Sequence, residues 1–260
     1  MKSENPESKF VGGTPAAYEG MILEEYAFCS MANHRGEMME YRLDLITAQD
    51  KPGAPRPVVI FVHGGGFLVP NDKRQSYIPV FARALTAAGY AVVSPDYPVF
   101  ETHAERSAWN ETQGADLAAE AVYRAYLYIR ENAERLSLDR DRIAVMGGSA
   151  GGMTCFYLLE HYDVSVRMFG NCWGVPRRYQ PDVSGFSPTL SIHGTEDALV
   201  SYALEAPIQA DLARLGIPAE LITVPGAGHT PIKEFDSYIP TVLAWLDRYV
   251  IDEHAQGNEA

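Results

Sequence analysis

One stretch of five residues constrains the fold of this chain more than any other. Residues 147–151 read Gly-Gly-Ser-Ala-Gly, and they directly follow an apolar run at 143–146. An apolar run that ends at such a stretch predicts a strand, a sharp turn at Ser149 and then a helix. Glycine has no Cβ, so the glycines on either side leave room for strained backbone at the serine. Ser149 is therefore expected at the apex of a turn, beside the N–H groups of a helix N-terminus.

Three further segments place reactive residue types after predicted strands. His63 is followed by three glycines at 64–66, Asp197 lies in His-Gly-Thr-Glu-Asp, and His229 ends Pro-Gly-Ala-Gly-His. Because the carboxyl ends of parallel strands meet at one edge of a sheet, these residues are expected near Ser149. Taken singly, the glycines fit an ordinary turn, Asp197 fits a solvated acid, and His229 fits a structural histidine. Their joint occurrence favours a catalytic set.

A serine, a histidine and a carboxylate in one place predict nucleophilic catalysis. The hydroxyl of Ser149 is inert at neutral pH unless a base removes its proton, and His229 is the candidate base. Asp197 is the candidate residue that orients His229, with Glu196 beside it as a rival. The turn glycines expose backbone N–H groups, which acyl transfer needs to stabilise the oxyanion.

These segments together resemble the α/β-hydrolase superfamily of the esterase/lipase type. The resemblance runs from about Tyr41 to Tyr249 and rests on HGGGF, GGSAG, HGTED and GAGH. It is nearest to acetylxylan/feruloyl-esterase-like proteins, close to hormone-sensitive-lipase-like esterases. The latter usually carry GDSAG and an acid loop that begins Asp-Pro-Leu. The departures here favour the small acetylxylan-type esterases, with prolyl-oligopeptidase catalytic domains as more distant relatives.

The resemblance implies roles for individual residues. It favours Asp197 over Glu196 as the acid, and it makes His63 and His193 supports for their loops. It implies an oxyanion hole of backbone N–H groups, an acyl-enzyme and no cofactor. The donors would come from Gly65, Gly66 and Ala150. None of the cysteines has metal-ligand spacing, so no metal site is expected.

The alternation of apolar strands and amphipathic helices predicts an α/β fold with a mostly parallel central sheet of about eight strands and helices on both faces. We expect a flexible arm over residues 1–20, one domain over 21–250 and a polar tail over 251–260. Expected strands are 22–28, 39–46, 58–62, 90–94, 143–146, 164–171, 190–192 and 221–224, the first two antiparallel. Expected helices are 78–88, 116–134, 153–160, 202–215 and 235–249. Only about fifteen residues, 175–189, join the sixth strand to the acid strand, so no large lid domain is expected.

Charge and composition exclude several classes of partner. The formal net charge of −13 argues against nucleic acid and anionic membranes, and it favours a neutral or cationic ester over a strongly acidic one. The polar N-terminus lacks an apolar signal core, which predicts a cytoplasmic protein. The final helix and an outer strand are candidate contacts of a homodimer.

The substrate pocket is expected beside the catalytic loops. Its predicted lining is Phe67, Tyr97, Trp173 and Thr230, with Leu68, Phe100 and Trp109 as further candidates. Arg177 and Arg178 lie near it and either bind a polar or anionic part of the substrate or are simply solvated.

The function predicted from these residues is hydrolysis of short-chain acyl esters, with acetyl esters of carbohydrates favoured. The alternatives are an amidase, peptidase or arylformamidase on the same scaffold, and a non-catalytic ligand-binding homologue.

Overall fold

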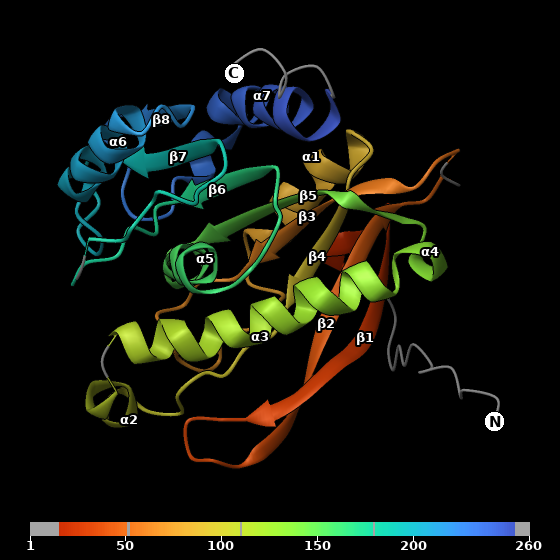
Figure 1. The fold of residues 1–260 in the computed structure, drawn as a ribbon, viewed down its shortest axis with the longest axis horizontal. Coiled ribbons are helices and arrows are strands. Elements are labelled where there is room, and N and C mark those ends of the chain that lie inside the picture. Colours follow the sequence, from red (N-terminus) through yellow and green to blue (C-terminus); the bar gives the residue numbers. More distant parts are fainter. Residues whose placement is uncertain (1–15, 51–52, 110, 179, 253–260) are drawn as a thin grey trace.

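The fold is built on one eight-stranded sheet (Figure 1). It is seen in a computed structural model that describes residues 16–50, 53–109, 111–178 and 180–252. The strands are β1 (Met21–Ala32), β2 (Met38–Ala48), β3 (Arg56–Val62), β4 (Ala91–Pro95), β5 (Leu138–Gly148), β6 (Met168–Cys172), β7 (Thr189–Gly194) and β8 (Ala219–Val224). Their spatial order is β1-β2-β4-β3-β5-β6-β7-β8. The first two strands are antiparallel to their neighbours, and the other six run parallel. The predicted sheet is confirmed.

Helices cover both faces of this sheet (Figure 1). They are α1 (Ile78–Ala87), α2 (His103–Ala108), α3 (Glu111–Glu131), α4 (Ala133–Leu136), α5 (Ala150–His161), α6 (Glu205–Arg214) and α7 (Phe235–Leu246). Short helical turns occur at Ala16–Tyr18, Tyr202–Leu204, Ile232–Glu234 and Asp247–Ile251. The helices α3 and α5 pack on one face, and α1 and α7 pack on the other.

The central strands are buried on both sides, which explains their continuous apolar sequences. In β3, Val58, Ile60 and Val62 join the core beneath α3 and α5. The alternate residues Val59 and Phe61 join the core beneath α1 and α7. Successive side chains of a strand point to opposite faces, so one apolar run serves two cores. This double burial fixes the carboxyl end of β3, where the glycine loop begins.

Several boundaries differ from the sequence-based prediction. The strand expected at 164–171 is Met168–Cys172, because the chain is still in a turn at Val164, whose N–H donates to Tyr162 O at 3.0 Å. The helix α3 begins at residue 111 rather than 116. The short helix α2, between β4 and α3, was not predicted at all.

The two ends of the chain are described only in part. Residues 1–15 of the expected arm and 253–260 of the expected tail lie outside the described residues. Tyr18 is only 1% exposed, and the Arg83 guanidinium donates to Ala17 O and Glu19 O at 3.2 and 3.0 Å. The last residues of the predicted arm therefore pack against the domain.

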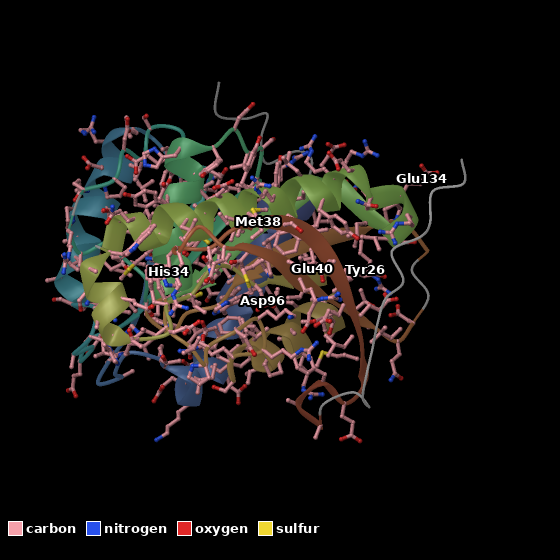
Figure 2. The ribbon with its side chains drawn as sticks, turned by 90° about the horizontal axis from the view of Figure 1, so that it is seen from below. Tyr26, His34, Met38, Glu40, Asp96 and Glu134 are labelled. Carbon is pink, nitrogen blue, oxygen red and sulfur yellow. The ribbon has the colours of Figure 1, made fainter. Side chains whose placement is uncertain are left out.

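The outer strands form a long hairpin at one edge of the sheet. Figure 2 shows Tyr26 on β1 and Met38 and Glu40 on β2 at this edge. Met38 is 67% exposed, whereas Tyr26 is 7% exposed. Across the described residues, no helix has the length and apolar character needed to cross a membrane.

Candidate active site

Ser149 occupies a strained turn between β5 and α5. Its φ of 54° and ψ of −118° lie outside the regions that L-residues favour. Its N–H donates to Cys172 O at 2.9 Å, which ties the turn to the end of β6. A Cβ on Gly147 would lie 2.4 Å from Gly151 O, and one on Gly151 would lie 2.1 Å from Val62 O. The glycines are therefore required because backbone passes directly against them.

The structure brings the three predicted residues Ser149, His229 and Asp197 together. The Nε2 atom of His229 lies 2.7 Å from Ser149 Oγ, and its Nδ1 atom lies 2.7 Å from Asp197 Oδ2. Because a carboxylate only accepts, Nδ1 donates to Asp197 and leaves Nε2 as the acceptor for the serine hydroxyl. Glu196 is exposed. The geometry therefore selects Asp197 over its neighbour as the partner of His229.

Asp197 is held as a carboxylate by the backbone of its own loop. Its Oδ1 accepts from Leu199 N–H at 2.8 Å and from Val200 N–H at 2.9 Å. Burial raises the pKa of Asp197, but the hydrogen bonds from Val200, His229 and Leu199 outweigh it and hold the pKa below its usual value. An ionised Asp197 is the form that stabilises a positive charge on His229.

A second histidine lies behind the acid. His193 is fully buried, and its Nε2 atom lies 3.1 Å from Asp197 Oδ2 and 2.9 Å from Val200 O. Its Nδ1 atom lies 2.9 Å from Oε1 of Glu205, a buried residue on α6 that also accepts from Asn171 Nδ2 at 3.0 Å. His193 lies in the supporting position that the resemblance implied, and it also touches the acid.

The glycine loop after β3 presents backbone N–H groups beside Ser149. The N–H of Gly64 already donates to Gln75 Oε1 at 2.8 Å and Tyr77 Oη at 2.6 Å. Within the described part of the chain, the N–H groups of Gly65, Gly66 and Ala150 have no hydrogen-bond acceptor. These three N–H groups are free to bind an oxyanion.

Two buried side chains hold this loop in place. His63 Nδ1 lies 2.9 Å from Gly64 O, and burial lowers the pKa of His63 to about 4, so the ring is neutral at pH 7. Tyr97 stacks on His63 at 4.1 Å and donates its hydroxyl to His63 O at 2.7 Å. This agrees with a supporting role for His63. The stacking and the hydrogen bond also show that Tyr97 supports the glycine loop.

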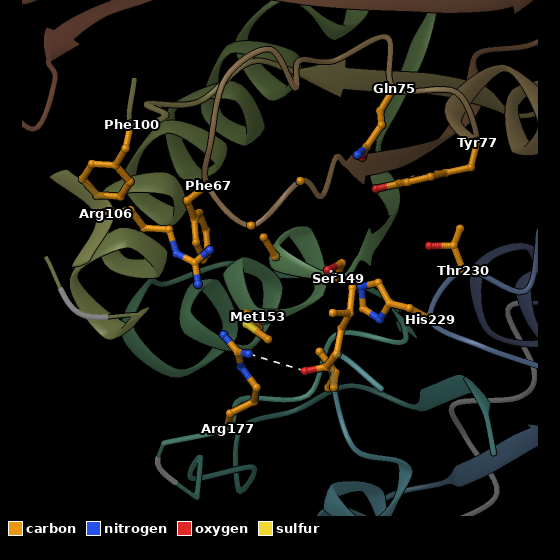
Figure 3. Close-up of a pocket in the computed structure, with 15 residues that line it drawn as sticks. Phe67, Gln75, Tyr77, Phe100, Arg106, Ser149, Met153, Arg177, His229 and Thr230 are labelled. Atoms are coloured by element: carbon orange, nitrogen blue, oxygen red, sulfur yellow. Dashed lines mark hydrogen bonds between the residues drawn. The ribbon is translucent and has the colours of Figure 1, made fainter. Parts of the chain in front are cut away.

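A cavity of about 320 Å³ opens at Ser149 (Figure 3). Phe67 and Thr230 line it as predicted, and so does the further candidate Phe100. The predictions for Tyr97 and Trp173 are corrected: neither lines the cavity, and their exposed fractions are 2% and 0%. Trp173 follows β6 with a φ of 49°, which turns its ring into the core against Tyr77 and Phe81.

Other lining residues were not predicted. Met153 lies on α5 one turn beyond Ser149, and Leu199 and Val200 come from the acid loop. Arg106 reaches the cavity from α2, opposite Arg177 from the connection between β6 and β7 (Figure 3). Leu68 and Trp109 do not line the cavity, and Arg178 is exposed outside it. No group of three or more His, Cys, Asp or Glu side chains among the described residues could hold a metal ion.

Comparisons with known proteins agree with this architecture. The BD-FAE family model matches residues 43–159. An alpha/beta hydrolase enzyme, MGS-M1, from a Medee basin deep-sea metagenome library superposes with a TM-score of 0.70 at 19% identity, covering 90% of this chain and 100% of that one. The chain therefore has the α/β-hydrolase fold.

The curated relatives that this chain matches share only part of their length with it. Esterase LipC of Mycobacterium tuberculosis is 36% identical over 110 residues, 42% of this chain and 24% of LipC. Dipeptidyl-peptidase 5 of Porphyromonas gingivalis is 22% identical over 210 residues, 65% of this chain and 30% of that protein. The chain thus spans about a quarter to a third of the length of these relatives.

Proposed function

We propose that this α/β-hydrolase is a serine carboxylic-ester hydrolase that acts through an acyl-enzyme on short acyl groups. The observation that carries the proposal is the continuous hydrogen-bonded set from Ser149 Oγ through His229 to Asp197, with 2.7 Å at each step. The unpartnered N–H groups of the glycine loop and α5 lie beside the serine. This combination supplies a nucleophile, a base and an oxyanion site with no further group required.

In the proposed first step, Ser149 Oγ attacks the ester carbonyl carbon while its proton moves to His229 Nε2. The carbonyl oxygen becomes an oxyanion held by the N–H groups of Gly65, Gly66 and Ala150. Asp197 stabilises the imidazolium that forms. His229 then protonates the departing alkoxide as the carbon–oxygen bond breaks, which leaves an acyl-serine.

Water completes the cycle by the same route in reverse. His229 accepts a proton from a water molecule as that water attacks the acyl carbon. The second tetrahedral intermediate collapses, His229 returns the proton to Ser149 Oγ, and the carboxylic acid is released. The proton taken from Ser149 leaves with the alcohol and a proton from water replaces it, so the enzyme ends each turnover unchanged.

The size of the cavity supports a short acyl group. Its volume of about 320 Å³ is at the lower end of ligand pockets, which range over about 300–1,000 Å³. Such a cavity fits acetyl or butyryl esters better than long acyl chains. Acetyl esters of carbohydrates fit this proposal as substrates, because the site would take the small acyl group and leave the sugar toward solvent.

An amidase or peptidase is the second candidate. Its support is the 22% identity to dipeptidyl-peptidase 5 over 65% of this chain. The same triad serves both reactions, but an amine is a poorer leaving group and needs firmer protonation by His229. A matched acetyl ester and acetanilide would separate the two, since an esterase cleaves only the first at an appreciable rate.

The proposal is tested by p-nitrophenol release from acetate, butyrate and octanoate esters with wild type and Ser149→Ala. We expect wild-type kcat/KM to be greatest for acetate or butyrate and smallest for octanoate. Ser149→Ala should lower turnover by about 10⁴- to 10⁶-fold. Near-normal hydrolysis by the variant would reject Ser149 as the nucleophile. Tight binding of an ester that neither protein cleaves would favour a non-catalytic binding protein.

A further inference from the structure

The cavity at Ser149 is cationic although the chain as a whole is acidic. The formal net charge is −13, yet the cavity lining contains Arg106 and Arg177 and no aspartate or glutamate. Because these two arginines line the same cavity as Ser149, their positive charge acts on any substrate that binds there. The net charge of the whole chain does not predict the sign of the charge in the cavity. Salt screens the interaction between exposed charges beyond about 10 Å at ordinary ionic strength.

Arg106 is positioned by the capping of its short helix. Thr102 caps α2 and exchanges hydrogen bonds with Glu105, whose N–H donates to Thr102 Oγ1 at 3.1 Å. Arg35 from the β1–β2 hairpin donates to Glu105 through Nε at 3.0 Å and to Glu101 through Nη2 at 2.9 Å. The contact with Arg35 spans 70 residues of sequence and holds α2 over the cavity.

Among the described residues, the Arg106 guanidinium has no acidic partner of its own. Glu105, its neighbour on the helix, is already paired with Arg35. Across the described ranges, no hydrogen bond or ion pair engages this half-buried guanidinium. A Cβ on Gly66 would lie 3.3 Å from its Nη1 atom, so the cation lies against the glycine loop that presents the oxyanion donors.

Arg177 approaches from the opposite wall. It belongs to the connection between β6 and β7, and its Nη1 atom donates to Leu199 O in the acid loop at 3.4 Å. Figure 3 shows the Arg106 and Arg177 side chains extending toward one another, with Met153 near them and His229 on the other side of Ser149. Both guanidiniums would attract an anion bound between them.

We propose that this cavity selects esters that carry a carboxylate, which the Arg106 guanidinium binds with Arg177 as the second cation. Guanidinium matches a carboxylate through two parallel N–H donors, and such charge-assisted bonds are about twice as strong as neutral ones. The proposal rests on the ester hydrolysis proposed above and names its substrate class. The carboxylate lies on either the acyl or the alcohol part of the ester, and two pairs of substrates distinguish these positions.

Two matched substrate pairs test this proposal. Ethyl butyrate and monoethyl succinate differ only by a carboxylate in place of the terminal methyl group of the acyl part. 4-Acetoxybenzamide and 4-acetoxybenzoate differ only by a carboxylate on the alcohol part. Wild type should favour the anionic member of one pair by at least about 10-fold in kcat/KM, which corresponds to one hydrogen bond to a charged group. The pair that shows the preference locates the carboxylate.

Variants of the arginines provide the controls. Arg106→Gln should lose most of the anionic-to-neutral preference, and Arg106→Lys should keep part of it, because it keeps the charge without the planar fork. Arg178→Gln is the matched control, since Arg178 is exposed outside the cavity, and it should keep the full preference. Equal or slower hydrolysis of both anionic esters by wild type would overturn the inference while the esterase proposal stands. An unchanged preference in Arg106→Gln would overturn it as well. Failure of every ester to be cleaved in a Ser149-dependent way would overturn both proposals.

Discussion

At the scale of single residues, His193 has an unusual set of partners. Glu205 Oε1 faces its Nδ1, and both Asp197 Oδ2 and Val200 O face its Nε2. When Glu205 and Asp197 are ionised, all of these atoms accept hydrogen bonds, and a ring protonated on both nitrogens satisfies them. Burial lowers the pKa of His193, but the hydrogen bonds and charges of Glu205, Val200 and Asp197 outweigh it and raise the pKa above its usual value. These contacts therefore favour the protonated, cationic form of His193 behind the acid.

This charge predicts a pH-dependent contribution to stability. A folded-state pKa above the unfolded value gives stability that is fully present below about pH 6.5 and is lost as pH rises through the folded pKa. Glu205→Gln removes the largest interaction that raises the pKa of His193. The free energy of unfolding in urea should therefore differ between wild type and this variant more at pH 6 than at pH 9. The same difference at both pH values would show that His193 is neutral in the folded protein.

The sequence predicted the reactive residues better than the cavity residues. Ser149, Asp197 and His229 each lie in the segment that follows a parallel strand, so the sheet brings them to one edge. Trp173 also follows a strand, but its positive φ turns the ring inward. The position of Arg106 depends on the contact between its neighbour Glu105 and Arg35, which lies 70 residues earlier in the sequence. A local sequence pattern cannot predict such a contact.

At the scale of secondary-structure elements, the site depends on how closely α5 approaches β3. A Cβ on Gly151 would lie 2.1 Å from Val62 O, which is backbone and cannot rotate away. Gly151→Ala should therefore destabilise the protein by about 3 kcal/mol, the upper end for overpacked positions, and reduce esterase activity by displacing Ser149. Gly185→Ala is the matched control, because a Cβ there meets nothing within 4 Å. Equal free energies of unfolding for the two variants would contradict this packing.

Elements with strong apolar patterns were predicted, and those fixed by distant contacts were not. The strands β3, β4, β5 and β7 lie where continuous apolar runs placed them, because burial on both faces requires such runs. The helix α2 buries none of its residues, so its sequence has no apolar periodicity from which a helix could be predicted. Its capping residues, Thr102 and Glu105, were the one local signal that could have located it.

At the scale of the whole molecule, access to the site depends on what covers the carboxyl edge of the sheet. The described residues between β6 and β7 contain no helix, and the six-residue α2 is the short element that borders the cavity. We therefore expect no interfacial activation. The rate of tributyrin hydrolysis should saturate smoothly as its concentration passes the solubility limit, measured by titration of released acid. An abrupt rise where the emulsion forms would contradict an open site.

The net charge of the chain does not predict the charge of the cavity lining. The value of −13 favoured neutral or cationic esters, whereas the cavity lining carries two arginines and no acid. A sum over the chain describes the surface field that a distant ligand meets. Selection within the cavity depends instead on a few groups at hydrogen-bonding distance. The difference explains why the net charge did not predict the proposed carboxylate.

The most direct test of the account is to locate the nucleophile by a covalent adduct. A p-nitrophenyl alkylphosphonate, which phosphonylates an activated serine and releases p-nitrophenol, would be added in increments, with esterase activity followed in parallel. We predict that activity falls in proportion to label, reaching zero at one adduct per chain, and that peptide mass spectrometry places the adduct on Ser149. Ser149→Ala should take up no label. Activity that persists with Ser149 fully phosphonylated, or an adduct on another residue, would contradict the account.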